Sequence, residues 1–162
     1  MAQKRKCINL KWDDVESDAR LLATKISKSG FKFDTILGVA RGGLVPAMLL
    51  SDLLSQRNIA TIQVRFYDNG TRLEKMQILN QPNTPLEGKR ILVVDDVSDV
   101  GATHEELIKW FGSQKAADFR FACLHVKPGT KPKPDFYTRE LDGWICYPWN
   151  KKEDMRMLEL RE

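Results

Sequence analysis

The alternation of apolar and polar positions along the chain predicts strands and helices that follow one another in turn. Four short apolar runs have the length and composition of buried strands: residues 33–39, 60–66, 91–94 and 118–126. Three longer segments repeat apolar side chains at helical spacing: residues 12–29, 44–54 and 103–111. Strands that alternate with helices predict an α/β fold, with a central parallel sheet and helices on both of its faces.

The strand predicted over residues 91–94 leads directly into acidic residues and a loop of small residues. Asp95 and Asp96 follow the strand at once, then comes Asp99, and Gly101-Ala102-Thr103 opens the next helix. Free backbone N–H groups and the positive end of a helix bind phosphate at such a junction. Carboxylates would repel a phosphate group bound directly beside them. They can take part in the same site if they bind sugar hydroxyls of the ligand and a divalent cation. The pattern therefore predicts a phosphorylated sugar as ligand, together with a metal ion.

A second loop of this kind follows the strand predicted over residues 33–39. Ala40-Arg41-Gly42-Gly43 separates that strand from an apolar helix with Pro46 in its first turn. Seen alone, Gly42-Gly43 is equally consistent with a tight turn. At the end of a strand and beside an arginine, two glycines let backbone amides approach a charged ligand, which favours a second anion site. Ligand loops at the ends of two strands fit a doubly wound sheet that binds its ligand at the carboxyl edge.

Length and composition describe one globular domain. The chain has 162 residues, 42% hydrophobic and 30% charged, so we expect a single domain over 1–162. The net charge of +4 suits an anionic substrate, and because no basic run is interleaved with aromatic residues we expect no nucleic-acid partner. No apolar run approaches the length of a membrane span and Lys4-Arg5-Lys6 leads into no signal-peptide core, which predicts a cytoplasmic protein without membrane contact. The spacing of Cys7, Cys123 and Cys146 predicts neither a disulfide framework nor a metal site, and Cys123 is expected to be a buried thiol.

The string from Ile91 to Thr103 closely resembles the phosphoribosyl-pyrophosphate (PRPP) motif of type I phosphoribosyltransferases. In that motif a strand precedes two acidic residues and an Asp-Thr-Gly-x-Thr loop, and this chain departs from it at Val100, where the family usually has threonine. The resemblance implies that Asp95 and Asp96 bind the ribose hydroxyls, directly or through Mg²⁺ and water. The loop keeps its backbone amides but loses one hydroxyl, and the resemblance implies that its residues bind the 5′-phosphate and ribose of PRPP: Asp99, Val100, Gly101, Ala102 and Thr103.

Two further segments resemble the loops that hold pyrophosphate and close the site in this family. Residues 38–46 resemble the pyrophosphate-binding loop of the bacterial xanthine–guanine enzymes, which implies a cis peptide bond at Ala40–Arg41. The pyrophosphate contacts would come from Ala40, Arg41, Gly42 and Gly43. The polar segment 67–88 shows no regular pattern, which is typical of a lid or a disordered segment, and we favour a lid. Three of its residues resemble the family's flexible catalytic loop, which closes over PRPP and excludes water: Tyr67, Asp68 and Arg72.

The C-terminal part resembles the base pocket of the purine enzymes. Lys127 follows a predicted strand, and Trp144 and Ile145 match the pocket in order and approximate spacing. The resemblance implies that the lysine donates to the purine 6-oxygen, the tryptophan stacks on the ring, and the backbone of Ile145 reads the exocyclic edge. A small hood over the active site would be built from about 128–162. Two aromatic residues in it are expected in the core instead: Tyr147 and Trp149.

These resemblances imply a type I phosphoribosyltransferase closest to the 6-oxopurine enzymes, the short xanthine–guanine and hypoxanthine–guanine phosphoribosyltransferases of archaea and bacteria. The expected reaction transfers ribose 5-phosphate from PRPP to N9 of hypoxanthine, guanine or xanthine in purine salvage, with Mg²⁺ neutralising the departing pyrophosphate. Asp99 is the candidate for proton exchange at the purine N7, since attack through N9 requires the imidazole ring to lose a proton. We expect a homodimer or homotetramer.

Two alternatives stay open. One is a regulator on the same fold that senses PRPP or a nucleotide without catalysis. The other is a phosphoribosyltransferase for another base such as adenine, against which Lys127 argues, because adenine presents a donor rather than an acceptor at the edge that the lysine would meet.

Overall fold

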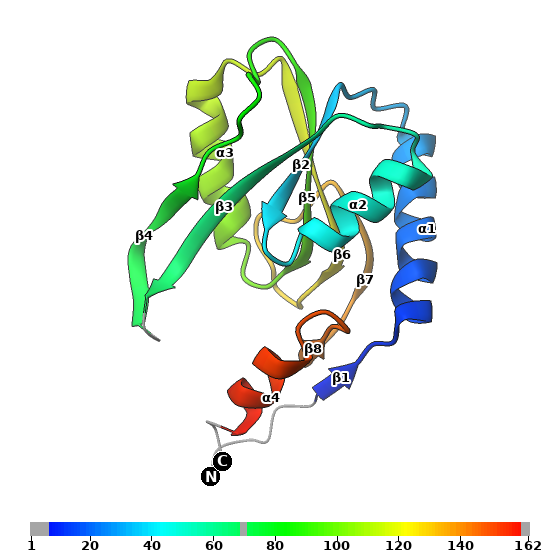
Figure 1. The fold of residues 1–162 in the computed structure, drawn as a ribbon, viewed down its shortest axis with the longest axis vertical. Coiled ribbons are helices and arrows are strands. Elements are labelled where there is room, and N and C mark those ends of the chain that lie inside the picture. The colour runs from blue at the N-terminus through cyan, green and yellow to red at the C-terminus, as the bar shows by residue number, and fades with distance from the viewer. Residues whose placement is uncertain (1–6, 69–70, 160–162) are drawn as a thin grey trace.

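The main sheet has six strands in the order β4-β3-β2-β5-β6-β7 (Figure 1). The computed structural model describes residues 7–68 and 71–159, with the side chains of 66–75, 153 and 157–159 left out of the description. The strands are β2 Thr35–Ala40, β3 Ile59–Asp68, β4 Thr71–Asn80, β5 Arg90–Ser98, β6 Asp118–Val126 and β7 Phe136–Glu140. Neighbouring strands run parallel except for β3 and β4, which are antiparallel. The predicted α/β fold with a central, mainly parallel sheet is confirmed.

Helices cover both faces of this sheet. In Figure 1, α1 and α2 lie on one side of it and α3 on the other. Leu92 and Val94 of β5 pack with residues of α1 and α2, whereas Ile91 and Val93 pack with residues of α3. Because β5 is buried on both faces, its sequence is a continuous apolar run. No helix within the described ranges is long and apolar enough to cross a membrane. The bounds of these helices are α1 Trp12–Ser29, α2 Leu44–Leu53 and α3 Ala102–Gln114.

The order of the strands reverses between β2 and β5. From β2 the chain passes through α2 to β3 on one side, whereas β5 lies on the other side of β2 and leads through α3 to β6. At such a reversal the loops at the carboxyl ends of the two strands diverge and leave a crevice for ligands. The pairing of β2 with β5 ends at Gly38 and Val94, and beyond this point the two strands lead to the predicted anion loops, which follow Ala40 and Ser98.

A second, two-stranded sheet joins residues 7–9 to the C-terminal part of the chain. Its strands β1 and β8 are parallel, with Ile8 opposite Ile145. With the helix that follows they lie at one end of the molecule (Figure 1), and we call them the β1–β8 unit. A disulfide joins Cys7 to Cys146, so the prediction that the cysteine spacing gives no disulfide framework was wrong; the two residues are 139 positions apart in sequence, which leaves no local pattern to read. The bounds of the unit are β1 Cys7–Asn9, β8 Trp144–Cys146 and α4 Lys151–Glu159.

The expectation of an irregular segment over residues 67–88 was wrong for its first half. β3 and β4 extend through it, with Tyr67 opposite Arg72. Met76 and Ile78 alternate with polar residues and pack against the core cluster on the α3 face, which is the pattern of a half-buried strand. Three side chains predicted to act in a flexible loop lie outside the described residues: Tyr67, Asp68 and Arg72.

Candidate active site

The loop between β2 and α2 lies directly against β5. The Ala40–Arg41 peptide bond is cis, as predicted. A Cβ atom added at Gly42 would overlap the carboxylate of Asp96, and one added at Gly43 would overlap the carbonyl oxygen of Val94. Only glycine allows this approach, so the predicted pyrophosphate loop and the acidic pair form one surface.

β5 continues past its apolar run and carries the acidic pair. Successive side chains of a strand point to opposite faces: Asp95 lines a cavity on the α3 side, whereas Asp96 contacts Gly42. The backbone N–H of Asp96 donates to Asp95 Oδ1 at 2.9 Å, and the N–H of Val97 donates to Asp96 Oδ1 at 2.7 Å. These bonds fix the direction of both carboxylates at the carboxyl end of the strand.

The electrostatics of the pair suit a divalent cation. Burial raises the pKa of Asp95 well above its usual range, and the nearby charge of Asp96 adds to the shift. Burial also raises the pKa of Asp96 to about 6, although the hydrogen bond from Val97 N–H opposes this. A bound cation would favour the ionised forms. In the described part of the chain no three His, Cys, Asp or Glu side chains form a ready-made metal site. Two carboxylates do fit Mg²⁺, which is commonly completed by water and substrate phosphates.

A cavity of about 140 Å³ lies beside β5 at the start of α3. α3 begins at Ala102, so the free N–H groups of its first turn are available at this loop. Gly101 has φ = 86°, and a Cβ there would overlap the carbonyl of Lys131. The side chain of Val100 is 60% exposed. The structure therefore brings the predicted residues of the phosphate loop together around one cavity: Asp95, Asp99, Val100, Gly101, Ala102 and Thr103.

The loop after β6 is held against this phosphate loop. The N–H of Lys127 donates to the carbonyl oxygen of Ser98 at 2.9 Å. The buried hydroxyl of Thr130 lies within hydrogen-bond distance of two carbonyl oxygens, those of Ser98 and Asp99. Lys127 therefore begins its loop next to the residues predicted to hold the sugar and its phosphate.

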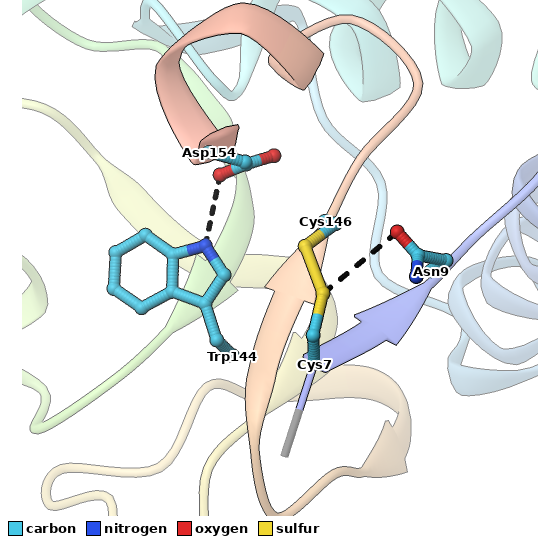
Figure 2. The surroundings of a disulfide bond; sticks show 5 residues. All are labelled: Cys7, Asn9, Trp144, Cys146 and Asp154. Atoms are coloured by element: carbon cyan, nitrogen blue, oxygen red, sulfur yellow. Dashed lines mark hydrogen bonds between the residues drawn. A yellow bond between two sulfur atoms is a disulfide. The ribbon is translucent and has the colours of Figure 1, made fainter. Parts of the chain in front are cut away.

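The other two predicted base-binding residues lie on β8. The indole N–H of Trp144 donates to Asp154 Oδ1 at 2.9 Å, and Figure 2 shows this bond beside the Cys7–Cys146 disulfide. Ile145 is buried. Among the described residues, the cavity wall includes neither these two nor Lys127, nor the loop Ala40–Gly43. Their contact with a base or with pyrophosphate stays a prediction.

Sequence reasoning missed a buried polar chain that ends at β5. His125 of β6 lies between Asp18 of α1 and Tyr147, which follows β8. The hydroxyl of Tyr147 donates to the carbonyl oxygen of Asp96 at 3.0 Å. Tyr147 is buried in the core, as predicted. The available signals were single polar residues, Asp18 and His125, within apolar patterns, and nothing local connected them.

The chain is similar to known phosphoribosyltransferases along most of its length. The phosphoribosyl transferase domain model matches residues 10–154. The xanthine-guanine phosphoribosyltransferase of Gluconobacter oxydans is 36% identical over 146 residues, which cover 86% of this chain and 82% of that protein. A crystal structure of purine phosphoribosyltransferase from Pyrococcus horikoshii is 39% identical, with a TM-score of 0.78 over 88% of this chain and 93% of that one. A Neisseria gonorrhoeae protein crystallised with bound ppGpp is 28% identical, with a TM-score of 0.79 over 99% of both chains. The chain belongs to the phosphoribosyltransferase family.

Proposed function

We propose that this protein is a purine phosphoribosyltransferase, which transfers ribose 5-phosphate from PRPP to N9 of a 6-oxopurine and releases pyrophosphate. The observation that carries the proposal is the contact of two ligand loops, because Gly42 after β2 lies against Asp96 on β5. One loop would hold the pyrophosphate and the other the ribose 5-phosphate, so the bond to be broken would lie between them. Relatives named xanthine-guanine phosphoribosyltransferase, at 36% and 34% identity, support purine salvage as the role.

The acidic pair is proposed to bind the ribose and Mg²⁺. Asp95 and Asp96 would hold the ribose hydroxyls directly or through the cation and water. A bound Mg²⁺ would neutralise charge on the departing pyrophosphate. The other side of the same surface would hold the pyrophosphate oxygens, chiefly through backbone amides: Ala40, Arg41, Gly42 and Gly43.

Residues 100–103 of the phosphate loop are proposed to bind phosphate, whereas Asp99, which precedes them, is proposed to act in catalysis. Residues 100–103 would hold the 5′-phosphate through backbone N–H groups and the positive end of α3. Asp99 would exchange the proton at purine N7, and its backbone carbonyl is already held by Thr130. The ends of β3 and β4 would close over PRPP and exclude water, through Tyr67, Asp68 and Arg72.

The base is proposed to bind between the Lys127 loop and β8. Lys127 would donate to the 6-oxygen, which excludes adenine because its amino group also donates. The N–H of Trp144 donates to Asp154, and the ring of Trp144 would stack on the base. The backbone of Ile145 would read the exocyclic edge.

The test is a screen of hypoxanthine, guanine, xanthine, adenine and uracil with PRPP and Mg²⁺, followed by ultraviolet absorbance. We expect nucleotide formation with the 6-oxopurines, loss of the reaction on addition of a chelator, and its return with excess Mg²⁺. Asp96→Asn is the matched variant, since it keeps the shape of the carboxylate and removes its charge. If PRPP binds tightly while no base is converted, the chain is a regulator instead, and ppGpp, which the gonococcal protein binds, becomes the first ligand to test.

Assembly and location belong to the same proposal. We propose one domain over residues 1–162 with a hood from about 128–162, acting as a homodimer or homotetramer in the cytoplasm. Leu44 and Met48 on α2 present apolar side chains to solvent, a surface that a second copy would cover. Light scattering measures the mass in solution, and a particle of 18.6 kDa would contradict the assembly.

A further inference from the structure

A chain of buried polar groups connects α1 with the carboxyl end of β5. His125 Nε2 lies 2.9 Å from Asp18 Oδ2, and the same oxygen accepts a hydrogen bond from Arg139. His125 Nδ1 lies 2.8 Å from the hydroxyl of Tyr147, which donates to the carbonyl oxygen of Asp96 at 3.0 Å. His125 and Tyr147 are fully buried and neither lines the cavity at the phosphate loop, so direct contact with substrate does not explain the chain.

The donors and acceptors give the chain a direction. A carbonyl oxygen only accepts hydrogen bonds. The hydroxyl of Tyr147 therefore donates its one proton to the carbonyl of Asp96, and it must itself accept a hydrogen bond from Nδ1–H of His125. The carboxylate of Asp18 also only accepts, so it favours a second N–H at Nε2, and the two bonds together require the doubly protonated imidazolium form of His125. Burial lowers the pKa of His125, and the hydrogen bond with Asp18 opposes that shift. Because Asp18 opposes the effect of burial, it is the group that favours the charged imidazole and, through it, the hydroxyl of Tyr147 directed toward Asp96.

The peptide unit between Asp96 and Val97 is held at both ends. Its N–H donates to the carboxylate of Asp96 at 2.7 Å, and its carbonyl accepts from Tyr147 at 3.0 Å. The paired residues of β5 and β6 continue to Ser98, whereas those of β5 and β2 end at Val94. A side chain thus holds this carbonyl just where β5 loses one of its neighbours. Rotation of the peptide plane would carry the carboxylate of Asp96 away from Gly42.

We propose that Tyr147 is a positioning residue for Asp96, and that His125 and Asp18 direct its hydroxyl. The proposal rests on the proposed function, in which Asp96 binds the ribose hydroxyls or Mg²⁺. A carboxylate that binds a metal ion or a sugar hydroxyl is commonly oriented by hydrogen bonds from residues that do not touch the ligand themselves, and these bonds hold it in its binding geometry. Tyr147 also follows Trp144 on the same segment, so the bond links the proposed base-binding residues to the ribose-binding residue.

The central variant is Tyr147→Phe, which removes the hydroxyl and keeps the ring that stacks on Trp149 at 4.6 Å between centroids. Loss of one hydrogen bond should raise the KM for PRPP, and the Mg²⁺ concentration for half-maximal rate, by about three- to tenfold. The KM for the purine base should stay unchanged. Tyr137→Phe on β7 is the matched control, because it also removes a tyrosine hydroxyl, one that lies outside this chain, and we expect no change in the three constants.

A second variant tests the chain from its far end. The side chain at position 18 contacts none of the residues proposed to bind substrate. Asp18→Asn should nevertheless raise the KM for PRPP and the Mg²⁺ concentration for half-maximal rate, as Tyr147→Phe does. Thermal unfolding of each variant reports loss of structure separately. Unchanged PRPP and Mg²⁺ constants in folded Tyr147→Phe would overturn the proposal, as would equal shifts in the PRPP and base constants; if that variant does not fold, Asp18→Asn decides by the same criteria. Asp96→Asn is measured alongside, because a normal PRPP constant there would refute the role of Asp96 rather than the role of Tyr147.

Discussion

The phosphate-binding edge and the β1–β8 unit are held together in different ways. At the edge, which comprises the loops after β2 and β5, glycines allow close approach because they carry no side chain: Gly42 meets the carboxylate of Asp96, whereas Gly43 and Gly101 meet backbone carbonyl groups. The β1–β8 unit has two strands of three residues each. Side chains fasten it, through the Cys7–Cys146 disulfide and the Trp144–Asp154 hydrogen bond.

The difference follows from what each region is proposed to bind. Phosphate is recognised by backbone N–H groups, and these do not depend on which side chains the loop carries, as long as the loop keeps its conformation. A base is recognised on its face and edge by particular side chains. Side-chain replacements should therefore have large effects among the base-binding residues and small effects at the phosphate loop. Asp99 is the exception at the edge, because its proposed task is proton exchange.

The largest effect is expected where one side chain chooses the base. Lys127→Ala removes the donor to the 6-oxygen and should lower the preference for 6-oxopurines over adenine by up to about 10⁴-fold. Trp144→Ala removes a stacking face, which accepts any flat base, and should weaken all bases together. The measurement is kcat/KM for hypoxanthine, guanine and adenine in the wild type and both variants. An unchanged ratio in Lys127→Ala would place base choice elsewhere.

Asp99→Asn tests the exception at the phosphate-binding edge. The variant keeps the shape of the side chain, so PRPP binding should survive while turnover falls by roughly 10²–10⁴-fold, the usual contribution of general acid–base catalysis. Single-turnover kinetics isolate the chemical step, and calorimetric titration follows PRPP. Normal single-turnover rates would exclude the role, and a loss of PRPP affinity alone would make Asp99 a binding residue.

Elements with a continuous local pattern were predictable almost to the residue. The helix over 12–29 and the strand over 118–126 have the predicted bounds. The strand predicted over 91–94 continues to Ser98, because the sequence cannot show that the acidic pair lies on the strand itself. β4 was missed because its apolar residues do not alternate regularly with polar ones along the strand: Leu73, Met76, Ile78 and Leu79.

The site divides in the same manner. The phosphate loop was readable because its thirteen residues, from Ile91 to Thr103, are consecutive. The cysteine pair and the polar chain from Asp18 to Asp96 were not, because they join distant parts of the sequence: the cysteines are 139 positions apart, and Asp18 and His125 are 107 apart. Such contacts arise from the packing of α1, β6 and β8, which no local spacing encodes.

Cys7→Ser measures how far the β1–β8 unit depends on its disulfide. Release of a loop this long should lower the free energy of unfolding by about 2–5 kcal/mol. We expect the KM for the base to rise and that for PRPP to change less, since the phosphate-binding edge has its own contacts. A reductant should bring the wild type to the stability of the variant and leave the variant unaffected. Three titratable thiols in the unfolded, unreduced wild type would show that the bond does not form in solution.

Val100→Thr should have the smallest effect, and it tests whether the backbone alone suffices at the phosphate loop. A threonine here restores the hydroxyl that the family usually has, and a hydrogen bond to a charged group contributes roughly 1.5–3 kcal/mol when well placed. Because Val100 is largely exposed, the replacement disturbs no packing, while solvent competition keeps the gain near the lower limit. We expect PRPP affinity to rise about tenfold by calorimetric titration. Val100→Ala is the control: it changes no donor, so its affinity should equal that of the wild type. Equal affinity in all three proteins would mean that the amides at the start of α3 already saturate the phosphate oxygens, whereas a loss in Val100→Ala would show that the side chain matters even where the backbone was expected to suffice.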